Sequence, residues 1–83
     1  MEYKVLIKLY VPEIEETYEF YIPINKQIGE IVKELCKIVS ELSKIYPKKE
    51  NVHLCNRYTG SVYKFSQTIR ESDIRNGSEL VMY

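Results

Sequence analysis

The segment that decides the fold is "TIRESDIRNGSELVMY", residues 68–83, where a turn-rich stretch leads into an apolar strand. Thr68 and Glu71 form a Thr-x-x-Glu pattern, in which side chain and backbone cap each other at the start of a helix. Asn76 and Gly77 follow with turn chemistry, so we expect this helix to have only one turn. The pattern therefore predicts a short helix that directs the chain into a last strand.

That last strand, "SELVMY", alternates between two faces. Leu80 and Met82 are predicted to face the core, because side chains of a strand point alternately to opposite sides. Glu79, Val81 and Tyr83 then point away from it. One face of the strand is expected to be buried and the other to carry mixed residues.

The middle of the chain has a helical pattern from about Lys26 to Ile45, and Asn25 is expected to cap it. Its apolar residues recur at spacings of three and four, at Ile28, Ile31, Leu35, Ile38, Leu42 and Ile45. The same spacing fits three heptads of a coiled coil. Val32 and Val39 favour the other interpretation, because they widen the stripe to three positions in seven, as in a helix that covers a sheet.

Four further segments alternate in the manner of strands, so five strands are expected in all. They span residues 3–11, 17–23, 51–55 and 61–65, and a proline-containing acidic connection at 12–16 joins the first two as a hairpin. Hairpin, long helix, two short strands, short helix and last strand follow one another in the order of a β-grasp domain. This α+β fold has a mixed five-stranded sheet with one long helix on one face.

The closing segment resembles that of ubiquitin-like domains, with matching residues at Thr68, Ile69, Ile74, Leu80 and Met82. Within this superfamily the chain is similar to the small bacterial YukD-like (EsaB-like) proteins. The similarity lies in the long helix, the "IPIN" that leads into it, the "LCNRYTG" turn and the closing segment. The resemblance implies a ubiquitin-like domain associated with type VII (ESX-like) secretion.

Composition limits the function. The 83 residues suit one domain, 1–83, and 12 basic residues balance 12 acidic ones, so no global field attracts nucleic acid. Lys4 and Lys8 interrupt the apolar run of a signal peptide, and no stretch is long enough for membrane insertion. Two cysteines are too few for a disulfide framework. We expect a cytoplasmic protein whose partners are proteins.

No catalytic motif is present, and the protein is not expected to be an enzyme. His53 and Cys55 should share the outward face of their strand, whereas Cys36 belongs to the helix on the opposite side of the sheet. These three side chains are not expected to meet around a metal ion, which for structural zinc needs four ligands. No cofactor is predicted.

Tyr83 bears on how such a domain is used. Conjugated ubiquitin-like proteins and sulfur carriers need a flexible tail that ends in two glycines, and a bulky residue on a paired strand offers none. We expect binding rather than conjugation. Two alternatives stay open: a sulfur carrier or conjugated modifier with an unseen C-terminal extension, and a general adaptor domain unrelated to secretion.

The outer face of the sheet is the predicted protein-binding surface, because its apolar, aromatic centre and charged rim are typical of interfaces. The resemblance to ubiquitin-like domains implies the same use of this face. The candidate residues are Leu6, Lys8, Tyr21, His53, Cys55, Val81 and Tyr83. A monomer or weak dimer is expected.

Overall fold

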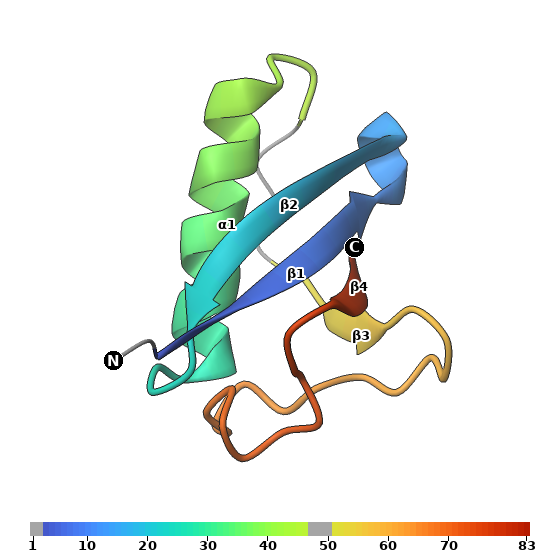
Figure 1. The fold of residues 1–83 in the computed structure, drawn as a ribbon. Coiled ribbons are helices and arrows are strands. Elements are labelled where there is room, and N and C mark those ends of the chain that lie inside the picture. The colour runs from blue at the N-terminus through green and yellow to red at the C-terminus, as the bar shows by residue number, and fades with distance from the viewer. Residues whose placement is uncertain (1–2, 47–50) are drawn as a thin grey trace.

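The computed structural model describes residues 3–46 and 51–83, and this part of the chain folds into one sheet with an α-helix across one face (Figure 1). Its elements are β1 (Lys4–Val11), a 3-10 turn (Pro12–Ile14), β2 (Glu16–Pro23), α1 (Ile28–Leu42), β3 (Leu54–Asn56) and β4 (Ser78–Met82). The strand order is β2-β1-β4-β3, with four strands among the described residues. The α+β class and the mixed sheet agree with the prediction.

The centre of the sheet is the parallel pairing of β1 with β4. Asn76 and Gly77 align the two strands, because the Asn76 Oδ1 accepts from the Leu6 amide at 2.7 Å and the Gly77 amide donates to the Leu6 carbonyl at 2.7 Å. Gly77 has φ +90°, a conformation that favours glycine. The predicted turn thus sets the register in which Leu9 lies opposite Leu80.

The core lies between the sheet and α1. Alternate residues of the strands are fully buried there, including Ile7, Leu9, Val11, Leu54, Leu80 and Met82. Ile69 and Ile74 of the closing segment have 0% and 1% of their surface exposed. The inward alternation predicted for β4 is confirmed.

The start of α1 is capped by backbone rather than by a side chain. Its first amides donate to the carbonyls of Gln67 and Phe65, from Ile28 at 2.7 Å and from Gly29 at 3.0 Å. The prediction that Asn25 caps the helix is wrong, because its side chain accepts from Arg70 instead. The start of α1 therefore depends on the segment at residues 65–67, whose carbonyls accept from its first amides.

The other end of α1 also differs from the prediction. The helix ends at Leu42, and Ile38, Leu42 and Ile45 have 38%, 61% and 74% of their surface exposed instead of lying in the core. The buried stripe instead runs through Leu35 and Val39. The last turn of α1 is thus largely uncovered by the rest of the described chain.

The predicted strand at 61–65 is reduced to one bridge, between Val62 and Cys55. Residues 65 and 67 use their carbonyls to cap α1, so the backbone turns away after Tyr63 and cannot continue a ladder. The five-strand prediction is corrected to four strands within residues 3–46 and 51–83.

The predicted short helix is a pair of turns. Thr68 and Glu71 make both bonds of the predicted pattern, at 2.9 and 3.2 Å, and the exchange lowers the pKa of Glu71. The amides of Ile69 and Arg70 donate to the carbonyls of Lys26 and Ile24, which lie far away in the sequence. Because these amides bond to a distant segment, they are not available for regular helical hydrogen bonds, and the segment stays as turns. In the described residues no helix is both long and apolar enough to cross a membrane.

Two leucines of α1 test this arrangement. Leu35→Ala should lower the free energy of unfolding by about 2–5 kcal/mol, because Leu35 has only 2% of its surface exposed. Leu42→Ala, the matched control, should change it by about 0.5 kcal/mol or less. Urea unfolding of both variants measures the difference, and equal losses would contradict the placement of the helix.

Candidate functional site

The outer face of the sheet, opposite α1, carries an apolar row that crosses three strands. The strand register places Val81 between Tyr10 of β1 and Cys55 of β3, and Val62 bridges to Cys55 on the far side. The His53 and Tyr83 rings lie next to this row with their centroids 5.3 Å apart. We call these residues the Val81 patch: Tyr10, His53, Cys55, Val62, Val81 and Tyr83.

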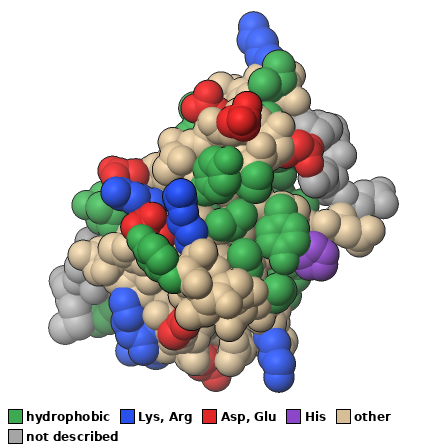
Figure 2. Space-filling view, turned by 90° about the vertical axis from the view of Figure 1, so that its right-hand side faces the viewer, with side chains coloured by type: hydrophobic (Ala, Val, Ile, Leu, Met, Phe, Trp, Pro, Cys, Tyr) green, Lys and Arg blue, Asp and Glu red, His purple; other side chains and the backbone are tan. Residues whose placement is uncertain are grey.

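The Val81 patch combines a shielded centre with exposed ends. Cys55 has only 9% of its surface exposed, whereas Val62 and Tyr83 have 54% and 41% exposed. Figure 2 shows hydrophobic side chains gathered on this side of the molecule beside the histidine. The patch is a continuous apolar surface, in contrast to isolated apolar residues, which are common on proteins.

A charged row borders the patch. Lys8 pairs across the strands with Glu19 of β2 and with Glu79 of β4. The Arg57 Nη1 lies 3.7 Å from the Glu79 Oε1, and its guanidinium carbon lies 5.2 Å from the centre of the Tyr10 ring. Charge alternates along this row, and Arg57 joins it to the patch through a cation–π contact.

The Glu79 carboxylate also orders an aromatic side chain at the rim. The Tyr58 hydroxyl donates to Glu79, and this hydrogen bond raises the pKa of Tyr58. Tyr58 nevertheless has 75% of its surface exposed. A mostly exposed aromatic ring that is already held in place loses little rotamer freedom when a partner covers it.

The turn after β3 positions these rim residues. The Asn56 Oδ1 accepts from the amides of Tyr58 at 2.8 Å and Thr59 at 3.1 Å, and Gly60 closes the turn with φ +75°. The Tyr63 hydroxyl then donates to Asp73 at 2.7 Å. The rim is thus fastened both to β3 and to the closing segment.

Of the seven candidate residues, Leu6 and Tyr21 lie outside the patch. They face each other on β1 and β2. Leu6 lies four residues along β1 from Tyr10, or about 13 Å at the usual strand rise. The row containing Lys8 separates Leu6 and Tyr21 from the Val81 patch, so the seven candidate residues do not form one surface. His53, Cys55, Val81 and Tyr83 do lie together, and Lys8 lies on the rim.

Sequence reasoning missed Arg57, Tyr58 and Val62. Val62 was expected to belong to a regular strand, and nothing local to "SVYKF" shows that it crosses over Cys55. Arg57 and Tyr58 lie in a turn whose orientation depends on Glu79, more than 20 residues away. The only local signal was the Asn and Gly of "NRYTG".

Cys36, the third side chain considered as a metal ligand, lies on the other side of the sheet. The Cys36 Sγ lies 3.9 Å from both the Tyr46 hydroxyl and the Met82 Sδ, beside a hollow of about 600 Å³ between α1 and Phe65. Cys55 instead belongs to the Val81 patch. Within the described ranges, no three His, Cys, Asp or Glu side chains converge on a possible metal site.

Tyr63 links pH to the stability of this site. Burial, followed by the hydrogen bond to Asp73, raises the pKa of Tyr63 to about 12 from 10.0. The contribution of Tyr63 to the free energy of unfolding is full below pH 10 and is lost as pH rises toward 12. The reason is that the Tyr63 hydroxyl ionises at a lower pH in the unfolded chain than in the folded one. Urea unfolding in that range should show a shallower loss of stability for Tyr63→Phe than for the wild type. Equal slopes would exclude this linkage.

Comparisons with known proteins give the fold. No family model matches the chain, and no curated protein is significantly similar to it. A chain of the MycP5-free ESX-5 inner membrane complex (State II) is 19% identical with a TM-score of 0.82, over 99% of this chain but only 21% of that one. The EccD5 ubiquitin-like domain from Mycobacterium xenopi is 14% identical over 96% of this chain and 92% of that one, with a TM-score of 0.80.

A third solved structure, Caldiarchaeum subterraneum ubiquitin, is 15% identical over 95% of this chain and 90% of that one, with a TM-score of 0.74. Identities this low carry information about the fold alone. Together with the strand order, the helix across one face and the closing segment, they show that this chain has the ubiquitin-like fold.

Proposed function

We propose that this chain is a non-enzymatic ubiquitin-like module that binds another protein through the Val81 patch. Its setting would be the bacterial cytosol, as a YukD-like accessory or regulatory component of a type VII (ESX-like) secretion system. The observation that carries the proposal is the apolar row of Tyr10, Val81, Cys55 and Val62 with its ordered charged rim. No cofactor takes part.

The chemistry of the patch supports a protein as the partner. Interface centres are rich in aromatic and aliphatic residues, and tyrosine and arginine contribute much of the binding energy. Such side chains are supplied by Tyr58, Tyr83 and Arg57. Glu79 holds Tyr58 and Arg57, and the His53 ring lies against Tyr83. Pre-ordered side chains lower the entropic cost of binding.

The secretion setting is supported by the similar structures. Two of them, a chain of the ESX-5 inner membrane complex and the EccD5 ubiquitin-like domain, align with almost the whole of this chain. One of those chains is about five times longer than the aligned region. We therefore propose that this chain binds a protein of the secretion machine.

The mode of action is proposed to be reversible binding rather than conjugation. The Tyr83 amide donates to the His53 carbonyl at 3.0 Å, and the His53 amide donates to the Tyr83 carbonyl at 2.6 Å. Both backbone groups of Tyr83 are therefore held in the sheet. Tyr83 is thus part of the folded domain rather than of a flexible segment, and this supports the proposal of reversible binding.

Intact-mass spectrometry tests the absence of conjugation. The full chain is incubated with ATP and cytosolic extract from a bacterium that carries a type VII system, and its mass is expected to stay unchanged. Extract without ATP is the control. An ATP-dependent adenylate, thiocarboxylate or conjugate would establish the carrier function and refute this part of the proposal.

Glutamate substitutions test the patch. Val81→Glu and Val62→Glu should each weaken binding to the captured secretion-machine protein by at least about tenfold, because a carboxylate would be buried without a partner. Val62 is half exposed, so its variant should keep the wild-type urea midpoint. Ile45→Glu on the helix side is the matched control.

The readout is affinity capture with mass spectrometry, followed by a binding titration against the purified partner. Recovery of a secretion-system protein by the wild type and the control, but not by the two patch variants, supports the proposal. Equal recovery by all forms would exclude the patch, and a partner unrelated to secretion would indicate a general adaptor.

A further inference from the structure

A second candidate surface lies on the side of α1 that faces β3, where the structure has a hollow of about 600 Å³. Val32 and Cys36 of α1 line it on one side, and Phe65 lines it on the other. A smaller hollow of about 310 Å³ extends from Phe65 to His53. Because Val52 and Phe65 line both hollows, they form one groove, which we call the α1–β3 groove.

The two sides of the α1–β3 groove are fastened to each other. The Gly29 amide donates to the Phe65 carbonyl at 3.0 Å, and a Cβ added at Gly29 would lie only 3.1 Å from the Phe65 Cβ. The Cys36 Sγ lies 3.9 Å from the Met82 Sδ of β4, so this part of α1 rests on the sheet. The groove is therefore preformed, and little ordering is needed when a partner fills it.

The lining of the groove suits an aromatic side chain. Phe65 has 40% of its surface exposed, so its ring is accessible for stacking. Sulfur atoms make favourable contacts with aromatic rings, and Cys36 supplies one on the opposite side. Sites that bind apolar groups are typically hollows of this size with a few polar groups in the lining. The polar residues here are Gln27, Glu30, Lys33 and Ser66.

Basic residues of α1 follow the groove. Lys33 lines it, and Lys37 lies one turn further along the same flank of the helix, both with exposed side chains. Among the described residues, neither lysine has a salt-bridge partner. The acids of α1 instead interact with Lys26, whose Nζ lies 2.8 Å from the Glu34 Oε1 and whose pKa is raised by Glu34 and, to a smaller extent, by Glu30. Lys33 and Lys37 thus give the groove a positive edge.

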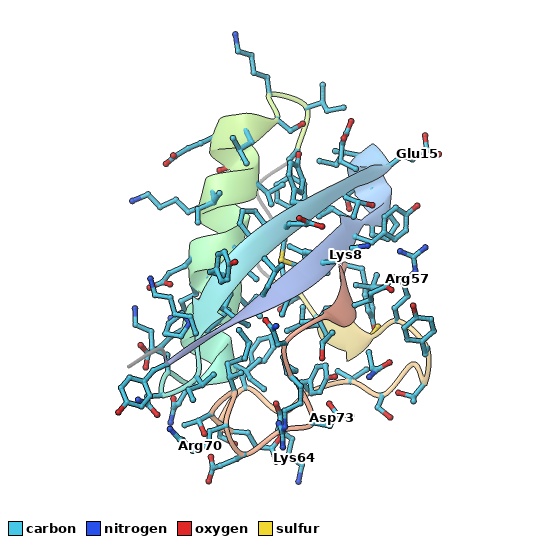
Figure 3. All side chains as sticks on the ribbon, viewed as in Figure 1. Lys8, Glu15, Arg57, Lys64, Arg70 and Asp73 are labelled. Atoms are coloured by element: carbon cyan, nitrogen blue, oxygen red, sulfur yellow. The ribbon has the colours of Figure 1, made fainter. Side chains whose placement is uncertain are left out.

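The chain's own acidic segment does not fit this groove. Glu13, Glu15 and Glu16 are exposed around the hairpin tip, and Figure 3 shows Glu15 there. Ile14, the aliphatic residue among them, belongs to the core and has only 8% of its surface exposed. A second copy of the chain would therefore bring negative charge without an apolar side chain to fill the hollow.

We propose that the α1–β3 groove binds an acidic segment of another protein that carries one aromatic anchor residue. The aromatic ring fills the hollow between Cys36 and Phe65. Carboxylates next to the anchor pair with Lys33 and Lys37, and this charge complementarity selects the segment. The groove shares only His53 with the Val81 patch and is a second binding surface beyond the proposed function.

A synthetic heptapeptide with a central phenylalanine flanked by glutamate residues is the probe. Titrated into the full-length ¹⁵N-labelled chain, it should shift the amide signals of Gly29, Lys33, Cys36 and Phe65, which lie along the groove. Peptides with lysine in place of glutamate, or with alanine in place of phenylalanine, should bind at least about tenfold more weakly. The first change reverses the charge, and the second removes the anchor.

Variants identify the contacts. Lys33→Glu should weaken binding of the glutamate peptide by at least about tenfold and keep the wild-type urea midpoint, because its side chain is exposed. Lys4→Glu, the same charge change on the outer face of the sheet, is the matched control and should bind like the wild type. Phe65→Ala should also weaken binding, while the backbone carbonyl that caps Gly29 is kept. Val81→Glu should bind the peptide normally, which separates the groove from the proposed function.

Five outcomes would overturn the proposal. The first two are an absence of amide shifts at millimolar peptide and equal binding of the glutamate and lysine peptides. The third is a set of shifts centred on Val81 and Tyr83 rather than on the groove. The fourth is binding of phenylacetate as tight as that of the peptide, since a small aromatic acid would then be the occupant. The fifth is a concentration-dependent dimer in sedimentation that Lys33→Glu abolishes, since a second copy would then fill the groove.

Discussion

The parallel pairing of β1 with β4 is the constraint on which the rest of the structure depends. It joins the two ends of the described chain and places Leu9 opposite Leu80, both without exposed surface. The bonds from Leu6 to Asn76 and Gly77 hold its register. Among the strands of the described residues, β2 lies next to β1 and β3 lies next to β4, so each outer strand takes its place from the central pair. A shift of one residue there would exchange core and surface on β4.

The same pairing creates both candidate surfaces. On the outer face it aligns Tyr10 with Val81 and Lys8 with Glu79, so apolar and charged rows run side by side across the strands. On the other face it places Met82 of β4 against Cys36 of α1, which lines the α1–β3 groove. The two surfaces differ in chemistry. The Val81 patch offers fixed side chains, whereas the α1–β3 groove offers a hollow with a positive edge.

Much of this could be read from local patterns. Alternation identified the inward residues of β4, and the spacing of Ile28, Ile31 and Leu35 placed a helix on a sheet. The closing segment indicated the ubiquitin-like fold. What local patterns missed are features made by distant parts of the chain. Carbonyls of Phe65 and Gln67 cap α1 in place of a side chain, and Val62 meets Cys55 by a single bridge.

By itself, the sequence determined which residues are apolar, where turns form and which face of each strand points inward, because these depend on side-chain period and on turn residues such as Asn76 and Gly77. Only the tertiary structure decided which of the outward residues become neighbours. It grouped Val81 with Cys55 and Val62. It placed Leu6 and Tyr21 together but away from that group, and it left Ile38 and Leu42 exposed. The physical reason is that strand order and register, which period does not encode, set the distance between side chains on different elements.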